Sequence, residues 1–257
     1  MNALQRYIVR RLLGGVPVLL GISLLAFLLA QLSPGDPAEI MLEGAGMGIP
    51  SAEEGASLHA YLGLDAPPYV QYGIWLWRIL QGDGGMSFHL GMPVFDALFA
   101  RLPVTAVLAA AALGWAVAGG IGLGLLMARM RGTVVEVLVR GVTQVMLAAP
   151  SFLMAVLLIL VFGVWLHILP TNGVDTAQGY ILPSLALALV TLAMAAQLLD
   201  SQLRDALASS YAQTARLRGL SEGRVLLTYA LPNAMLPVVA MLGNFFAAVL
   251  GGAIIVE

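Results

Sequence analysis

The sequence predicts an all-α integral membrane protein, a polytopic bundle of transmembrane helices. Of its 257 residues, 60% are hydrophobic and only 10% are charged, and the mean hydropathy is +0.92. A soluble domain carries about 25% charged residues. The charges are also clustered, which leaves several uncharged runs long enough to cross a hydrocarbon core of about 30 Å. The chain has no cysteine, so disulfides and thiolate metal sites are excluded.

The first element is a transmembrane helix preceded by a basic arm. Arg6, Arg10 and Arg11 come before an uncharged run over residues 12–35. The alternative is a cleaved signal peptide, but the run is too long for one and no small-x-small cleavage site precedes the next turn. We therefore expect residues 1–32 to form a cytoplasmic arm and an uncleaved first span.

Residues 33–101 are predicted to form an extracytoplasmic domain. They hold eight acidic residues, only two arginines, and turn sequences such as SPGDP and QGDGG. Tyr69, Tyr72, Trp75 and Trp77 supply an aromatic patch. Aromatic rings gather at membrane surfaces, so we favour an interfacial belt over a ligand site, which stays the alternative.

The core transmembrane domain follows over residues 102–257. Its first helix, over residues 102–128, has four glycines within residues 119–124, and small residues let neighbouring helices approach closely. A phosphate-binding loop is excluded because the chain has no lysine. We therefore expect close helix packing at Gly119, Gly120, Gly122 and Gly124.

Three further spans are predicted after a basic loop over residues 129–140. The uncharged run over residues 141–174 is too long for one perpendicular span and contains Pro150. We expect a short helix or break before Pro150 and a span over about residues 151–169. The last two spans lie within residues 181–199 and 234–256.

Arginine placement predicts the orientation. When the loops are assigned alternately, ten of the twelve arginines fall on the side of the N-terminus, the 129–140 loop and the 200–224 segment. The positive-inside rule makes that side cytoplasmic and places residues 38–98 outside.

Residues 198–237 are the only long polar interruption in the apolar second half. Five apolar residues recur at four-residue spacing, which predicts one amphipathic helix with Asp200 and Arg204 on its polar faces. The apolar face consists of Leu199, Leu203, Leu207, Tyr211 and Ala215.

This helix should end at Gly219, where a left-handed C-terminal cap favours glycine. Arg216 and Arg218 lie in its last turn, where cations complement the helix dipole. Ser221 is a candidate N-cap of a second helix. Pro232 and Pro237 should bend or end that helix as it enters the membrane.

The same segment resembles the cytoplasmic EAA motif of the permease subunits of ABC importers. That motif reads EAA, three residues, Gly, nine residues, Ile, one residue, Leu-Pro. Here Gln213, Thr214 and Ala215 stand at the EAA positions and Gly219 at the glycine, whereas the leading Glu is missing. Tyr229 replaces the isoleucine, and Leu231-Pro232 closes the motif.

The segment YAQTARLRGLSEGRVLLTYALPNAMLPVV is similar in sequence to members of the dipeptide, oligopeptide and nickel branch of these permeases. The resemblance implies a type I importer permease fold in the bacterial inner membrane, with a coupling segment over residues 200–233. It also implies contact with the ATPase through ten residues. These are Tyr211, Gln213, Thr214, Ala215, Arg216, Arg218, Gly219, Leu220, Leu231 and Pro232.

The partners implied are a second, homologous permease, two ATP-binding cassette ATPase subunits, an extracytoplasmic substrate-binding protein and membrane lipid. We expect no catalytic or ATPase site, no cofactor, no bound metal and no nucleic acid. The branch has six spans, so we expect a sixth to be missing after Glu257. The substrate implied is nickel, a metal chelate or a peptide, and YVQYGIWLW and ARLRGL favour nickel-type members.

Other classes of membrane protein remain as alternatives at this point. A non-ABC channel or a membrane scaffold would share the spans but has no reason to keep the Gly219 and Leu231-Pro232 spacing. A proton-coupled carrier is disfavoured because the predicted spans contain no charged residue except at their ends. His59, His89 and His167 are isolated from one another and form no metal or catalytic motif.

Overall fold

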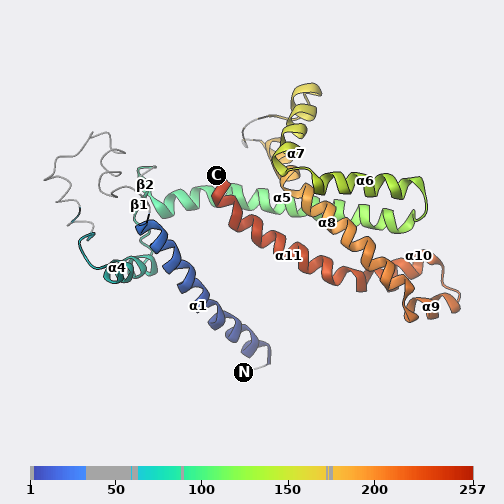
Figure 1. Ribbon diagram of the computed structural model, residues 1–257, viewed down its shortest axis with the longest axis horizontal. Helices are drawn as coiled ribbons and strands as arrows, with labels where there is room; N and C mark the ends of the chain where they lie inside the picture. Colours follow the sequence, from blue (N-terminus) through green and yellow to red (C-terminus); the bar gives the residue numbers. More distant parts are fainter. Residues whose placement is uncertain are drawn as a thin grey trace. The chain divides into compact units, whose positions relative to one another are not determined.

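The computed structural model describes residues 3–32, 59, 63–87, 90–171, 173 and 176–256, and the chain divides into two compact units. The first unit is Met1–Ala100 and the second is Arg101–Glu257. Figure 1 shows that the described residues are almost entirely helical. The predicted all-α class is therefore confirmed. Much of the predicted extracytoplasmic domain, including residues 33–58, lies outside the described residues.

The first unit contains the predicted N-terminal helix and a short helix packed against it. Helix α1 is Ala3–Gln31 and helix α4 is Pro68–Leu80. The hydroxyls of Ser23 and Tyr72 lie 2.8 Å apart, and Phe27 on α1 makes an edge contact with the ring of Tyr72 at 5.4 Å. The aromatic patch therefore divides, because Tyr72 faces α1 whereas Trp77 is 63% exposed. Strands β1 (Met86–Ser87) and β2 (Met92–Pro93) pair as a small antiparallel ladder before α5.

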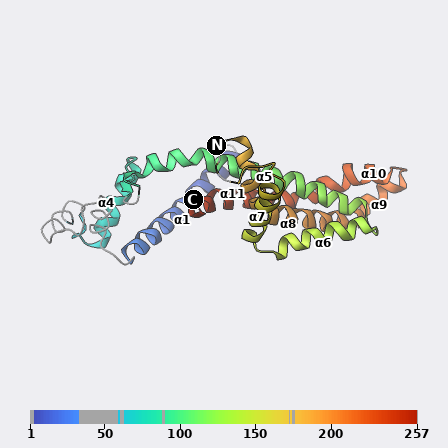
Figure 2. The same ribbon diagram turned by 90° about the horizontal axis from the view of Figure 1, so that it is seen from above.

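The second unit is built from long helices joined by short breaks. Helix α5 (Val94–Arg129) begins in the first unit and continues through the second. In both views α6 returns alongside the other helices, and α7 turns away from it (Figure 1, Figure 2). The remaining helical elements are α6 (Val134–Ala148), α7 (Ser151–Leu158), a π turn (Ile159–Trp165), a 3-10 turn (Ala177–Tyr180), α8 (Ile181–Ala208), α9 (Ser210–Leu217), α10 (Glu222–Arg224), a second π turn (Val225–Ala230) and α11 (Leu231–Val256).

Among the described residues, four helices are long and apolar enough to cross a membrane. They are Gln5–Gln31, Val94–Arg129, Ala177–Ala208 and Glu222–Leu250. A fifth span is present if α6 and α7 are counted together, although the pair bends by 113° at its break. The break predicted before Pro150 is confirmed, because α6 ends at Ala148 and Ala149 is extended. Proline disfavours helical backbone in the residue before it, which explains the position of the bend.

Close packing of α5 on α8 confirms the interpretation of three of the four glycines. A Cβ on Gly120 would lie 2.6 Å from Cβ of Ala195, and one on Gly124 would lie 2.9 Å from Cβ of Leu199. Gly119 similarly faces Leu192. The interpretation is wrong for Gly122, because no atom lies within 4 Å of its added Cβ. The core on both sides of this contact consists largely of alanine, which keeps the helices close.

One predicted helix boundary is wrong, and for the second helix, which Pro232 and Pro237 were expected to bend or end, the structure excludes the end. The single helix expected up to Gly219 is broken at Ser209, which is extended with ψ 159° and separates α8 from α9. The Ser209 hydroxyl makes no N-cap hydrogen bond to α9 and instead donates to the carbonyl of Ala206 at the end of α8, a local side-chain bond that competes with the helix. The second helix ends at neither Pro232 nor Pro237, because the helical stretch runs on from Glu222 to Leu250. The missing N–H of Pro232 instead falls just after a π turn, where the regular hydrogen-bond ladder is already interrupted.

Candidate functional site

Helix α9 has one buried face and one exposed face. Ala212 and Ala215 are buried against Val225 of the second π turn, and Leu207, Leu220 and Tyr229 pack around this contact. The small alanine side chains let α9 lie close to the π turn. Ala215 is therefore a buried packing residue of the segment rather than part of its free surface.

The turn after α9 has the hydrogen bonds of a Schellman cap. The N–H of Gly219 donates to the carbonyl of Arg216 at 2.9 Å, and the N–H of Leu220 donates to that of Ala215 at 3.3 Å. Gly219 has φ +81°, which glycine adopts without the steric cost of a side chain. The predicted glycine cap is therefore confirmed. Ser221 occupies the predicted N-cap position of α10, but its side chain makes no cap hydrogen bond.

Arg216 closes the turn from the side. Its Nε donates to Oε1 of Glu222 at 2.7 Å, its Nη2 donates to Oε2 at 3.1 Å, and its Nη1 donates to the carbonyl of Leu207 at 2.9 Å. Hydrogen bonding to the Glu222 carboxylate raises the pKa of Arg216 above its usual range. This fork is a contact that the dipole argument did not predict, since it joins α9 both to the end of α8 and to α10.

The exposed face of α9 carries two more of the predicted residues, Gln213 and Thr214, and several others lie after the helix. Gln213 and Thr214 are exposed, and their side chains bond to carbonyls of their own chain, at Ala208 and Ser210. Arg218 and Pro232 are also exposed, whereas Leu220 and Leu231 are half-buried.

Tyr211 was placed on the apolar face, and this was wrong because its side chain is 40% exposed. The break at Ser209 changes the direction of the chain, so the four-residue spacing does not continue from α8 into α9. Sequence reasoning also missed Leu217, which is 89% exposed. It lies three residues after Thr214, and this i,i+3 relation could have placed it on the exposed face.

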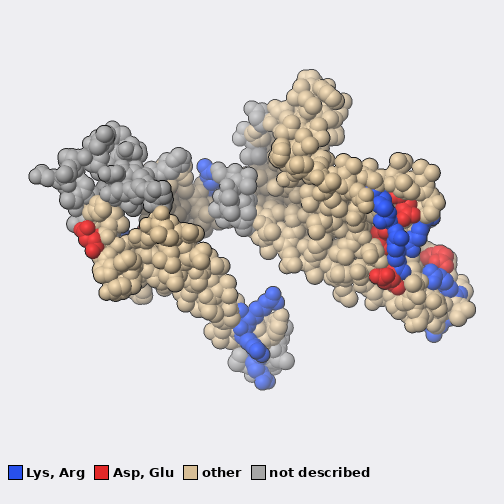
Figure 3. Space-filling view, viewed as in Figure 1, with Lys and Arg blue, Asp and Glu red and all other residues tan. Residues whose placement is uncertain are grey.

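A second feature missed by sequence reasoning is the burial of Asp200. It was assigned to a polar face of the helix, which gave no sign of burial, but its side chain is only 2% exposed. Its arginine partners come from α6 and the preceding turn as well as from α8, and a single helix pattern contains no information about them. Most charged atoms of this unit gather over the end that carries α9 and α10 (Figure 3).

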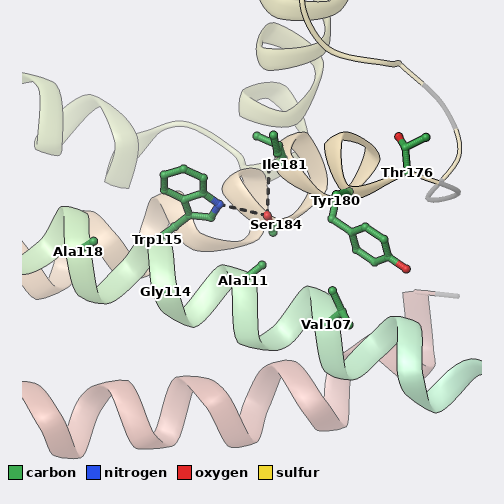
Figure 4. A pocket seen from close by; sticks show the side chains of 10 residues that line it. Val107, Ala111, Gly114, Trp115, Ala118, Thr176, Tyr180, Ile181 and Ser184 are labelled. Carbon is green, nitrogen blue, oxygen red and sulfur yellow. Dashed lines mark hydrogen bonds between the residues drawn. The ribbon is translucent and has the colours of Figure 1, made fainter.

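A cavity of about 800 Å³ opens between α5 and the start of α8. The indole N–H of Trp115 donates to Oγ of Ser184 at 3.2 Å, and this hydroxyl donates to the carbonyl of Ile181 (Figure 4). The ring of Tyr180 lies at the same opening. None of the lining residues is charged. They are Val107, Ala111, Gly114, Trp115, Ala118, Thr176, Ala177, Tyr180, Ile181 and Ser184.

Membrane-length helices with a capped polar helix pair between the last two of them are the features expected of an ABC importer permease, and the comparison with known families shows this class. The chain belongs to the family described as binding-protein-dependent transport system inner membrane component, which matches residues 120–257. The N-terminal region of the same membrane components matches residues 4–109. This membership decides against the channel and scaffold alternatives and confirms the inner-membrane location.

Curated relatives place the chain in the peptide, oligopeptide and nickel branch. It is 38% identical over 251 residues to the glutathione transport system permease protein GsiC of Salmonella typhimurium, covering 98% of this chain and 81% of the relative. It is also 38% identical over 253 residues to GsiC of Escherichia coli K12, with the same coverage. These relatives are permease proteins, so the chain is a transport subunit rather than an ATPase. The preference for nickel is not supported by them.

Proposed function

We propose that this permease imports a short peptide and is driven by separate ATPases that dock on the coupling segment, residues 200–233. The observation that carries the proposal is the two-faced helix α9. Its inner face is buried, whereas Leu217 is 89% exposed and Tyr211 is 40% exposed. An exposed leucine beside Arg218 offers an apolar contact and a charge to a partner, which a solvated loop does not need.

The assembly proposed has four membrane-associated subunits and one extracytoplasmic protein. A second permease completes the translocation path, and two ATPases supply the energy, since ATP binding favours one of two permease conformations. A substrate-binding protein delivers the cargo to the proposed extracytoplasmic domain, residues 33–101. The N-terminal arm and span, residues 1–32, and the core, residues 102–257, complete this division of the chain.

The names of the relatives favour a peptide over nickel as the substrate. Glutathione is a short peptide, and the relatives named for its transport are similar to this chain over 98% of its length. Uptake of labelled glutathione, a labelled dipeptide and labelled nickel into cells that carry the complete transporter distinguishes the classes. Saturable nickel uptake without peptide uptake would overturn the peptide assignment and leave the permease function intact.

The coupling proposal is tested at Gly219, with Gly223 as the matched control. Valine at Gly219 must adopt φ near +81°, at a cost of about 1–3 kcal/mol. Gly223 lies in α10 without a positive φ, and no atom lies within 4 Å of its added Cβ, so a side chain there carries neither the backbone strain nor a clash at its first carbon. We expect Gly219→Val to abolish uptake and to reduce recovery of the ATPase with the purified permease, while membrane abundance is kept. Gly223→Val should behave like the parent chain.

The outcomes of this experiment are separable because membrane abundance is measured alongside uptake and ATPase recovery. Equal loss of abundance and uptake in Gly219→Val would mean that the substitution only destabilises the protein. Normal ATPase recovery and normal uptake at normal abundance would refute the docking role of the segment.

A further inference from the structure

A network of ion pairs around one buried carboxylate joins helices α6 and α8 at the start of the coupling segment. Two arginines each bridge both carboxylates: Nη2 of Arg140 donates to Asp200 Oδ2 at 2.7 Å and to Glu136 Oε1 at 2.9 Å. Nη2 of Arg204 donates to the same two oxygens at 2.8 Å and 3.1 Å. The Asp200 cluster is defined as Asp200, Glu136, Arg131, Arg140 and Arg204.

Two further contacts extend this cluster to the turn between α5 and α6. Nη2 of Arg131 lies 3.4 Å from Oδ1 of Asp200. The backbone N–H of Gly132 donates to the Glu136 carboxylate at 2.7 Å. A single acid on α8 is therefore tied to the turn before α6, to α6 itself and to its own helix.

The position of the cluster gives it mechanical consequences. Asp200 lies two turns before the end of α8 at Ala208, after which α9 begins. One turn further back, Nε2 of Gln197 donates to Oγ1 of Thr143 on α6 at 3.2 Å, so the two helices are joined at successive turns. At its other end α6 meets α7 at the 113° bend. A force on α9 therefore reaches that bend through α8 and α6.

The two carboxylates of the cluster are largely buried, so their ion pairs are more specific than ion pairs on the surface. An exposed ion pair contributes little and tolerates exchange of partners, whereas a buried carboxylate requires all of its partners to stay in place. The Asp200 side chain is 2% exposed and Glu136 is 13% exposed. Separation of α6 from α8 would break the Arg140–Asp200 and Arg204–Glu136 pairs and leave each carboxylate with only the arginine of its own helix.

The geometry points to Asp200 as a positioning residue that clamps α6 to α8, so that movement of the coupling segment is transmitted to the α6–α7 bend. This inference rests on the proposed function, because the movement originates at the ATPase. The proposed role of Asp200 differs from that of α9. Helix α9 contacts the ATPase, whereas the Asp200 cluster transmits the resulting movement of α8 to α6.

The test compares Asp200→Asn with Asp205→Asn in the complete transporter reconstituted in liposomes. Asparagine keeps the size of the side chain and removes its charge. Asp205 lies on the same helix and is exposed, and among the described residues it makes no hydrogen bond or ion pair with the Asp200 cluster. It precedes α9 and is not one of the ten residues expected to contact the ATPase, so it is a matched control. We expect Asp200→Asn to bind the ATPases and hydrolyse ATP normally while substrate moved per ATP falls about tenfold, within the range usual for coupling between sites. Asp205→Asn should keep the parent ratio.

A cross-link between α6 and α8 in this cysteine-free chain tests whether holding the two helices together restores transport in Asp200→Asn. Thr143→Cys and Gln197→Cys, joined by a short bifunctional methanethiosulfonate reagent, hold α6 on α8 without the charges. We expect the cross-link to restore the transport ratio of Asp200→Asn, and reduction of the reagent to abolish the restoration. An unchanged ratio in Asp200→Asn, or a loss that the cross-link does not restore, would overturn the clamp.

Failure of the proposed function gives a different result. If the segment does not dock ATPases, no ATPase is recovered with the purified parent chain, and Gly219→Val does not change that result. If only the clamp is wrong, the parent chain and Asp205→Asn recover the ATPases and transport normally, and Asp200→Asn does so as well.

Discussion

The contact between α5 and α8 allows a substitution of a single methyl group to be evaluated from the structure. In Gly120→Ala the added Cβ would lie 2.6 Å from Cβ of Ala195 and 3.3 Å from the carbonyl oxygen of Leu192. Carbon atoms pack at about 3.5–4.0 Å, so the helices must separate by about 1 Å. Neither neighbour can rotate away, because one is a Cβ and the other is backbone. Overpacking of this kind costs about 1–3 kcal/mol.

Gly122→Ala is the matched control for this prediction. It makes the same chemical change two residues along α5, where no atom lies within 4 Å of the new Cβ. Alanine also favours helix over glycine by about 1 kcal/mol, so this variant should equal or exceed the parent in stability. Thermal unfolding of the two purified variants in the same detergent measures the difference. If Gly120→Ala unfolds at the same temperature as Gly122→Ala, the close approach of the two helices is wrong.

Two further predictions concern the orientation and the cavity wall. In the cysteine-free chain, an impermeant thiol reagent on intact cells should label Gln81→Cys but not Ser210→Cys, and the reverse pattern would refute the assigned orientation. Ser184→Ala removes the acceptor of the Trp115 indole and should lower the free energy of unfolding by about 1 kcal/mol in denaturant titration. Ser201→Ala, on the exposed side of the same helix, should leave it unchanged.

The sequence alone predicts features that depend on neighbouring residues in the chain. The break before Pro150 follows from the geometry of one proline, and the cap at Gly219 follows from one glycine after a helical pattern. The first span and the broad class follow from uncharged runs of membrane length. Each of these is a local rule, and the structure bears them out.

Features that depend on distant residues are those that sequence reasoning missed. Asp200 looks like a surface residue in its own helix, because its α6 partner Arg140 lies 60 residues earlier in the chain. The contacts of Gly120 and Gly124 with α8 could be expected in kind, but only the structure distinguishes them from Gly122. The break at Ser209 was also missed, because the apolar spacing continues across it in sequence although the backbone does not.

Helix α9 is fixed to its neighbours at three points, so a weak contact of a partner with its surface can displace the neighbouring helices. Its buried alanines fix it to the second π turn, the Schellman cap at Gly219 fixes its end, and Arg216 bonds both the end of α8 and the start of α10. An element held at three points transmits displacement, whereas a loop absorbs it in its own backbone. The exposed pair of Arg216 with Glu222 contributes little to stability by itself. The pair joins α9 to α10, and the bond from Arg216 to the Leu207 carbonyl joins α9 to α8, the helix that contains Asp200.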